Sequence, residues 1–352
     1  MNVVGVLIAS AASLNVRAQF DEYMRAFSKV YESIEEEELR FRIFAGSLEA
    51  IANGNAERAA RGAQQTQGLT RFADWTPEEF RARFLTLKPR RTFAPPGAPM
   101  AAPSREACPA CTRFPKLAIT RNMSAWDWTH MGAVTAVKDQ SGCGACWAFS
   151  VSADVEGTHF LAGNNLTNLS MEQLISCDPE AQGQGCTHGG EPSLAMKYVV
   201  DAGLTSLEAY PFKDAQGPPH THCSPDKIVA PLARIASWLQ VSSAPNPKDT
   251  GLADALVRLG PLSNCIDASA MMHYSSGVDD PVSTGPDRQC EDGHTNHAVL
   301  IVGYGVDRGK PYWKIKNSWG TAWGEQGFYR VVRGENKCGL ATDVVHSVAA
   351  GV

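Results

Sequence analysis

The sequence predicts an α+β protein built in two parts, a helical segment followed by a larger domain that contains both helices and strands. In residues 19–87, Glu, Arg and Ala are frequent and apolar residues recur at helical spacing. From Trp126 onwards Gly, Trp and Cys become frequent, and short runs such as HAVLIVGYG and YWKIKNSWG predict strands. Between the two parts, residues 88–118 hold seven of the 21 prolines, which predicts an exposed linker.

The first residues form an apolar run, Val3 to Ala12, followed by small residues and a candidate cleavage site at Val16-Arg17-Ala18. Such a run is too short to span a bilayer and is typical of a secretory signal. We therefore expect residues 1–18 to be a signal peptide, with an ordinary helix start as the alternative. The rest of the sequence predicts no membrane span.

The amino-acid composition limits which cellular compartment and which classes of binding partner we expect. With 43% hydrophobic and 20% charged residues, the 352-residue chain can bury a sizeable core, and its net charge of -5 predicts no nucleic-acid partner. Ten cysteines, together with the signal-like start, favour an oxidising route with disulfides, hence the secretory pathway. The sequence leaves two destinations of that route open, a lysosome or other acidic vesicle and the outside of the cell. Candidate glycosylation sites on that route are Asn122, Asn165 and Asn168.

Three helices are expected in the first part. One carries apolar residues at steps of three and four from Phe20 to Tyr31. The second starts near Ile34, and the breakers Asn53-Gly54-Asn55 predict its end. The third begins at Thr76-Pro77-Glu78-Glu79, with Pro in the first turn.

Two cysteines, Cys143 and Cys146, lie close together in DQSGCGACWAFS. They could form a redox pair, bind a metal ion together, or have unrelated roles. The redox interpretation calls for a tryptophan before the pair, whereas Trp147 follows it. The zinc interpretation lacks a second ligand pair at suitable spacing.

A different chemistry is favoured by residues farther along the chain. Cys146 opens a predicted helix, whose dipole stabilises a thiolate. His297, at the start of an apolar strand, can act as the base, and Asn317, after a second strand, can orient the imidazole. This combination predicts Cys-His-Asn nucleophilic catalysis.

Three stretches, GAVTAVKDQSGCGACWAFS, NHAVLIVGYG and KNSWGTAWGEQGFYRVVRG, resemble the catalytic blocks of papain-family (cathepsin L-like) cysteine proteases. The resemblance implies a papain-like two-lobed fold over residues 119–352, with a helical lobe, a β-barrel-like lobe and an active-site cleft between them. It also assigns roles: nucleophile, Cys146; base, His297; orienting amide, Asn317; oxyanion donor, Gln140; shielding indole, Trp319. Because all four catalytic positions are filled, an inactive binding protein on this scaffold is disfavoured.

The first part resembles the inhibitory propeptide of that family. The residues that fit its helix signature and its following motif are Glu36, Arg40, Ile43, Phe44, Ile51, Asn55, Gly68, Phe72 and Asp74. Ser47 and Thr70 stand where the family has Asn. The resemblance implies a zymogen in which residues 19–87 lie backwards across the cleft and residues 88–118 contain the activation region.

The resemblance also sorts the cysteines. It implies three disulfides, Cys143–Cys186, Cys177–Cys223 and Cys290–Cys338, and it leaves Cys146 free. Cys265 is expected to be an unpaired buried thiol. Cys108 and Cys111 lie in the linker without counterparts, where they can pair with each other or stay single.

The residues implied in substrate binding surround a pocket for the side chain two residues before the cut bond, together with the extended substrate backbone. They are Gly144, Gly189, Gly190, Glu191, Pro192, Cys265, Thr295, Ala298, Trp319 and Asp343. An acid at the base of the pocket, here Asp343, implies acceptance of basic as well as apolar side chains, unless it turns to solvent. One extra residue near Thr187-His188 departs from the family pattern and leaves the local geometry open.

The implied activity is that of an endopeptidase on protein and peptide substrates, because the large insertion of carboxydipeptidase relatives is missing before Cys223. No metal or cofactor is implied. The expected partners are substrates, the chain's own propeptide as an intramolecular inhibitor, and cystatin-type inhibitors, with the protein itself a monomer. Loss of charge at Asp74 and at Glu35 to Glu38 is expected to loosen the propeptide at acid pH.

Overall fold

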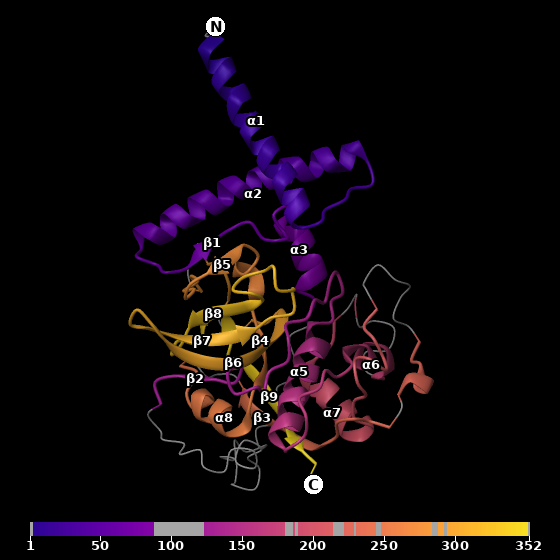
Figure 1. Ribbon diagram of the computed structural model, residues 1–352. Coiled ribbons are helices and arrows are strands. Elements are labelled where there is room, and N and C mark those ends of the chain that lie inside the picture. Colours follow the sequence, from indigo (N-terminus) through magenta and orange to yellow (C-terminus); the bar gives the residue numbers. More distant parts are fainter. Residues whose placement is uncertain are drawn as a thin grey trace.

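The computed structural model describes residues 3–87, 123–179, 186, 189–213, 222–228, 230–243, 248–283, 288–291 and 294–350. Residues 3–87 form an N-terminal segment, and the residues from 123 onwards form the main domain. Figure 1 shows the helices of the N-terminal segment gathered on one side of the main domain, with strands and helices side by side below them. The arrangement is the α+β architecture that the sequence predicts. Among the described residues, no helix is long and apolar enough to cross a membrane.

Two long helices cross in the N-terminal segment, α1 (Val3–Ala26) and α2 (Ile34–Ala60). An aromatic cluster with Phe20, Tyr23 and Phe44 at its centre fills their crossing. The first helix ends before Tyr31, because the chain turns at Ser28, which has a φ of 52°. The periodic pattern therefore overestimates the length of this helix at its C-terminal end.

The predicted end of the second helix is wrong, since α2 runs through Asn53-Gly54-Asn55 to Ala60. Asn55 does not break the helix, because its side chain exchanges two hydrogen bonds with the backbone of Gln67, at 2.8 and 2.9 Å. Gly54 leaves room for its neighbours: a Cβ there would lie 2.7 Å from the side-chain ends of both Arg58 and Gln67. Tertiary contacts thus override two helix-breaking residue types.

The third helix, α3 (Pro77–Phe84), begins where the sequence predicts. Thr76 and Glu79 form a reciprocal capping box, with Thr76 Oγ1 accepting from the Glu79 N–H at 3.1 Å and Glu79 accepting from the Thr76 N–H at 2.8 Å. Before it, the short strand β1 (Thr66–Gln67) pairs with β5 (Tyr274–Ser276) of the main domain. The N-terminal segment is therefore joined to the main domain by strand pairing as well as by packing.

One lobe of the main domain is a twisted antiparallel sheet. Its strands are ordered β3 (Ile235–Ser243), β9 (Asp343–Ala349), β4 (Leu262–Ile266), β6 (His297–Asp307), β7 (Lys310–Lys316) and β8 (Phe328–Val332), with β2 (Trp126–Asp127) pairing to β6. Helix α8 (Leu252–Leu259) contributes Leu252 and Leu256 to the apolar cluster of this lobe.

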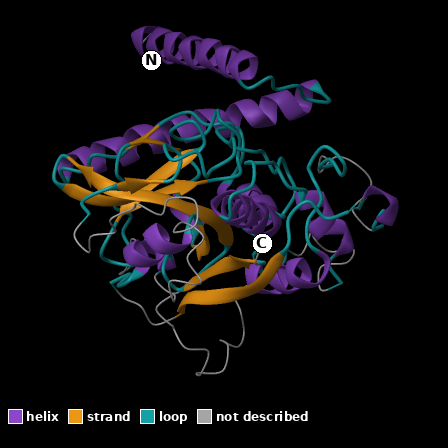
Figure 2. Cartoon of the chain, turned by 60° about the horizontal axis from the view of Figure 1, so that its bottom comes forward, coloured by secondary structure: helices purple, strands orange, loops and turns teal. Residues whose placement is uncertain are grey.

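The other lobe is helical and has a core of its own. Helices α5 (Cys146–Leu161), α6 (Met171–Cys177) and α7 (Pro192–Ala202) bury a second apolar cluster. Both views show the N-terminal helices along one edge of the two-lobed domain (Figures 1 and 2). The two separate cores confirm the two-lobed fold expected from the sequence.

Three disulfides hold the loops of the main domain, Cys143–Cys186, Cys177–Cys223 and Cys290–Cys338. They are the pairs that the resemblance implies. Cys146 and Cys265 are free and buried. Cys108 and Cys111 lie outside the described residues.

Candidate active site

Cys146 is the first residue of α5, so its thiol lies at the positive end of the helix dipole. Backbone N–H groups of Trp147 and Ala298 face the sulfur. Ala298 follows His297 at the start of β6, and this contact brings the thiol beside the histidine. The neighbouring Cys143 is held in a disulfide, so the two cysteines of DQSGCGACWAFS do not form a pair with each other.

The imidazole of His297 is bound by Asn317. Its Nε2 lies 2.8 Å from Asn317 Oδ1, and both side chains are buried. The contact follows from the sheet: β6 and β7 are antiparallel neighbours, so the first residue of β6 meets the residue that follows β7. Trp319 covers this pair, with its ring centroid 4.8 Å from that of His297.

Gln140 is fixed in the loop before α5. Its Nε2 donates to the carbonyl of Cys143 at 2.8 Å, and its Oε1 accepts from Ser318 Oγ at 2.6 Å. A backbone bond from Gln140 N to Ser318 O, also 2.8 Å, joins the same two loops. Gln140 therefore lies between the start of α5 and the loop that carries Asn317.

Burial shifts both titratable groups of this site toward their neutral forms. It raises the pKa of the Cys146 thiol to about 12 and lowers the pKa of His297 to about 4. The hydrogen bond to Asn317 and the nearby backbone of Phe84 oppose this shift of the His297 pKa. In this covered state, burial favours the neutral thiol and the neutral imidazole.

The cover is the last stretch of the N-terminal segment. The backbone of Phe84 contacts His297, Thr86 Oγ1 donates to Gly144 O at 3.0 Å, and Leu87 N donates to Asn296 O at 3.1 Å. A Cβ at Gly144 would lie 2.3 Å from Thr86 Oγ1 and 2.5 Å from a backbone oxygen. The absence of a side chain at Gly144 is what allows this close approach.

Three phenylalanines of the N-terminal segment pack on Trp319. The rings of Phe72, Phe80 and Phe84 lie edge-on to its indole, at centroid distances of 5.5, 5.2 and 6.0 Å. Edge-to-face geometry at these distances is favourable for aromatic pairs. The N-terminal segment thus covers the Trp319 indole, whose exposed fraction is 0%.

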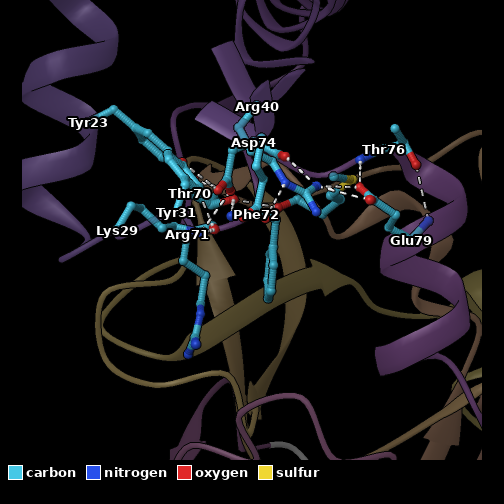
Figure 3. A network of polar contacts seen from close by, with 12 residues as sticks. Tyr23, Lys29, Tyr31, Arg40, Thr70, Arg71, Phe72, Asp74, Thr76 and Glu79 are labelled. Carbon is cyan, nitrogen blue, oxygen red and sulfur yellow. Dashed lines mark hydrogen bonds and ion pairs between the residues drawn. The ribbon is translucent and has the colours of Figure 1, made fainter. Parts of the chain in front are cut away.

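A polar network holds the loop that carries Phe72 and Asp74 (Figure 3). Asp74, itself 2% exposed, accepts hydrogen bonds from Tyr23 at 2.5 Å, Lys29 at 2.8 Å and Tyr31 at 2.9 Å. Arg40 of α2 bridges the backbone carbonyl of Asp74 and the carboxylate of Glu79. Residues predicted from separate motifs, Arg40 and Asp74, therefore meet in one cluster.

The site thus consists of a buried thiol at a helix start beside a His-Asn pair, and a segment of the same chain covers it. Two protein-family models match the two parts of the chain. The family model "Papain family cysteine protease" matches residues 123–348, and "Cathepsin propeptide inhibitor domain (I29)" matches residues 20–80. The chain belongs to the papain family of cysteine proteases. It is a zymogen whose N-terminal segment contains the inhibitory propeptide domain.

Individual relatives agree with this assignment. Cysteine proteinase 15A of Pisum sativum is 36% identical, over 96% of this chain and 87% of the relative. Digestive procathepsin L 3 from Tenebrio molitor larval midgut has a TM-score of 0.75 at 31% identity, covering 95% of this chain and 99% of the other. The bromelain protease of Ananas comosus, solved with the E64 inhibitor, has a TM-score of 0.55 at 34% identity, covering 65% of this chain and all of the other.

In this papain-family zymogen, Leu87 of the propeptide packs among residues expected to line the substrate pocket. Cys265 and Ala298 are opposite partners on β4 and β6, and both share an apolar cluster with Leu87 and Cys146. The Sγ of Cys265 lies 3.8 Å from Asp343 Oδ2. Asp343 therefore turns one oxygen toward the cluster and not wholly to solvent.

The other expected pocket residues lie at or just before the starts of α7 and β6. Glu191 precedes α7 and Pro192 is its first residue, while Thr295 is buried before Asn296. Gly189 and Gly190 approach Thr86 and the Trp147 ring so closely that a Cβ would lie 2.4 and 2.5 Å from them. Thr187 and His188 lie outside the described residues. Among the described residues, no group of three or more His, Cys, Asp or Glu side chains could hold a metal ion.

Two residues, one in contact with Asp343 and one in contact with the propeptide, were not predicted from the sequence. Gln240 on β3 donates to Asp343 Oδ1 at 2.8 Å, and His273 accepts a backbone hydrogen bond from Gly68 of the propeptide at 2.9 Å. Neither belongs to a motif, and both contacts depend on strand pairing. The first pairs β3 with β9, and the second lies beside the pairing of β1 with β5.

Proposed function

We propose that the mature domain is an endopeptidase in which Cys146 is the nucleophile, His297 the acid and base, and Asn317 the residue that orients His297. The observation that carries the proposal is the 2.8 Å contact between His297 Nε2 and Asn317 Oδ1, beside a free cysteine at the start of α5. Asn317 leaves the Nδ1 edge of the imidazole without a partner among the described residues. That edge is available for the thiol.

Removal of the propeptide would restore water to the cleft and allow a proton to pass from Cys146 to His297. The thiolate then attacks the scissile carbonyl carbon, and the oxyanion accepts hydrogen bonds from the Gln140 amide and the Cys146 backbone N–H. His297 returns its proton to the leaving amine, which departs as the thioester forms. A water molecule, deprotonated by His297, hydrolyses the thioester and regenerates the thiol.

Inhibition by the propeptide follows from the direction of the chain in the cleft. Phe84 lies at His297, whereas Leu87, later in the sequence, lies in the Cys265 and Ala298 cluster. A substrate places the residue that fills this pocket before its scissile bond, so its chain runs the opposite way. The reversed orientation supports an inhibitory role, because the propeptide fills the cleft without placing a peptide bond in position for cleavage.

Substrate preference is proposed to depend on Asp343. The pocket around Leu87 is apolar at Ala298 and Cys265, which favours Leu or Phe two residues before the cut bond. The carboxylate of Asp343 at its base favours Arg or Lys at the same position. Both classes of side chain are therefore expected to be accepted.

Maturation is proposed to be favoured by acid. Acidification is proposed to act on the ion pair between Lys29 and Asp74 inside the network of Figure 3, whose loss would weaken the loop that carries Phe72. The proposed route is secretory, to an acidic vesicle or the exterior, and the three disulfides support it.

The catalytic proposal is tested by comparing matured wild type, Cys146→Ala, His297→Ala and the exposed-residue control Ser237→Ala on an unstructured protein substrate. We expect the first two variants to lose cleavage at internal bonds and the control to retain it. Because Cys146→Ala cannot mature itself, each protein is matured by the same added protease. Internal cleavage by Cys146→Ala at the wild-type rate would refute the proposal.

A further inference from the structure

Gln240 makes a set of hydrogen bonds that fixes the orientation of its side chain beside the substrate pocket. Its Nε2 lies 2.8 Å from Asp343 Oδ1, 2.8 Å from the carbonyl oxygen of Ser242 and 3.2 Å from that of Val344, so its two N–H hydrogens are shared among three acceptors. All three partners are acceptors, so the amide nitrogen must face them. An irregularity in the pairing of β3 with β9, between Gln240 and Ser242, lies at this point.

The two oxygens of Asp343 have different surroundings. Oδ1 is held by Gln240, whereas Oδ2 faces the Cys265 thiol at 3.8 Å, on the side of the cluster that contains Leu87. Within the part of the chain that the structure describes, no Lys, Arg or His forms an ion pair with Asp343. Among the described residues, the carboxylate thus has a neutral donor at each oxygen and no cationic partner.

The amide oxygen of Gln240 is also informative. Gln240 Oε1 is buried and has no hydrogen-bond partner among the described residues. A buried acceptor without a partner costs stability, so such groups need an explanation. The explanation here is that the Gln240 side chain is oriented so that its nitrogen binds the Asp343 carboxylate, which leaves its oxygen without a partner.

We propose that Gln240 is a specificity-determining positioning residue, which holds Asp343 so that Oδ2 faces the pocket and accepts a basic side chain of the substrate. The inference rests on the proposed role of Asp343 at the base of this pocket. A neutral donor suits this task, because Lys or Arg at residue 240 would itself neutralise the carboxylate. Gln240 acts through Asp343 and has no part in cleavage of the peptide bond.

The test compares kcat/KM for two peptide substrates that differ only in having Arg or Leu two residues before the cut bond. Matured wild type, Gln240→Leu, Asp343→Asn, the double variant and the same-strand control Ser237→Ala are measured. Loss of a hydrogen bond to a charged group predicts an Arg/Leu ratio lower by about tenfold or more in Gln240→Leu. Cleavage of the Leu substrate is expected to stay near wild type, and Gln240→Met repeats the test with a more flexible apolar side chain.

The double variant separates positioning from a structural effect. If Gln240 acts through Asp343, adding Gln240→Leu to Asp343→Asn should not lower the ratio further. An equal fall for both substrates, or an unchanged ratio in Gln240→Leu while Asp343→Asn lowers it, would overturn the inference and leave the role of Asp343 intact. An unchanged ratio in Asp343→Asn would overturn both.

Discussion

Leu87 of the propeptide donates its backbone N–H to the carbonyl of Asn296 at 3.1 Å, one residue before His297. Its side chain is 5% exposed and shares a cluster with Cys146, Cys265 and Ala298. A single propeptide residue thus makes a main-chain contact beside the proposed base and fills the proposed substrate pocket.

Replacing Leu87 by Ala should therefore weaken inhibition. Loss of a buried leucine side chain costs about 1.5–3 kcal/mol of docking free energy. We expect the full-length Leu87→Ala zymogen to mature faster than wild type, measured as the appearance of activity on a small peptide after acidification. Leu69→Ala, at a residue 39% exposed, is the control. Equal maturation rates for Leu87→Ala and wild type would show that the pocket contact does not restrain the propeptide.

Asn317→Ala should lower activity without removing the nucleophile. The change removes the 2.8 Å contact that orients His297 and supports its protonated form. A hydrogen bond to a charged group contributes about 1.5–3 kcal/mol, which predicts a fall of roughly 10- to 100-fold in kcat/KM. Asn165→Ala, at an exposed residue, serves as the control. Wild-type kcat/KM in Asn317→Ala would argue against an orienting role.

His273 should make release of the propeptide dependent on pH. Burial lowers its pKa from 6.5 to about 4 in the zymogen, and its backbone lies against Gly68 of the propeptide. Release is expected to return water to the imidazole and to raise its pKa toward 6.5. Because the released form then binds a proton more readily, propeptide docking weakens as the pH falls between these two values.

We therefore expect His273→Leu to slow maturation at acid pH, by up to about tenfold, and to leave the neutral-pH rate near wild type. The measurement is the maturation rate as a function of pH. His130→Asn is the matched control, since the His130 side chain is 83% exposed. A His273→Leu profile that coincides with wild type would exclude this contribution.

Asp74→Asn should destabilise the propeptide itself. The variant leaves Lys29, whose side chain is only 17% exposed, without its carboxylate partner. Removing one member of a buried ion pair costs about 3 kcal/mol. We expect the Asp74→Asn zymogen, carrying Cys146→Ala to prevent self-cleavage, to lose its propeptide to an added protease at neutral pH faster than its parent. Equal resistance to the protease would contradict the stabilising role of the network.

The sequence predicted the reactive residues better than the contacts that control them. Cys146, His297 and Asn317 each open or follow a strongly patterned helix or strand, so their elements were predictable and the fold then brings them together. The predicted end of α2 was wrong, because the Asn55 side chain forms hydrogen bonds with Gln67, which lies outside the helix. Local pattern carries no information on such a contact.

Gln240 and Leu87 show the same limit. Gln240 lies in an unremarkable strand, IASWLQVSS, and its relation to Asp343 exists only through the pairing of β3 with β9. Leu87 precedes the proline-rich stretch without a motif of its own, and its role depends on where the chain crosses the cleft. Both contacts join residues that are far apart in the sequence.

The proposed nucleophile is tested most directly by labelling thiols in the matured enzyme. The native protein is treated with a limiting amount of iodoacetamide, residual activity is measured, and the alkylated cysteine is identified by mass spectrometry. We predict that loss of activity parallels alkylation of Cys146, and that His297→Ala greatly slows the reaction at Cys146. Cys265 is expected to react far more slowly, because burial and the Asp343 carboxylate raise the pKa of its thiol, and this carboxylate stays beside it after the propeptide leaves. Full alkylation of Cys146 with activity retained, or loss of activity while Cys146 stays unmodified, would contradict it.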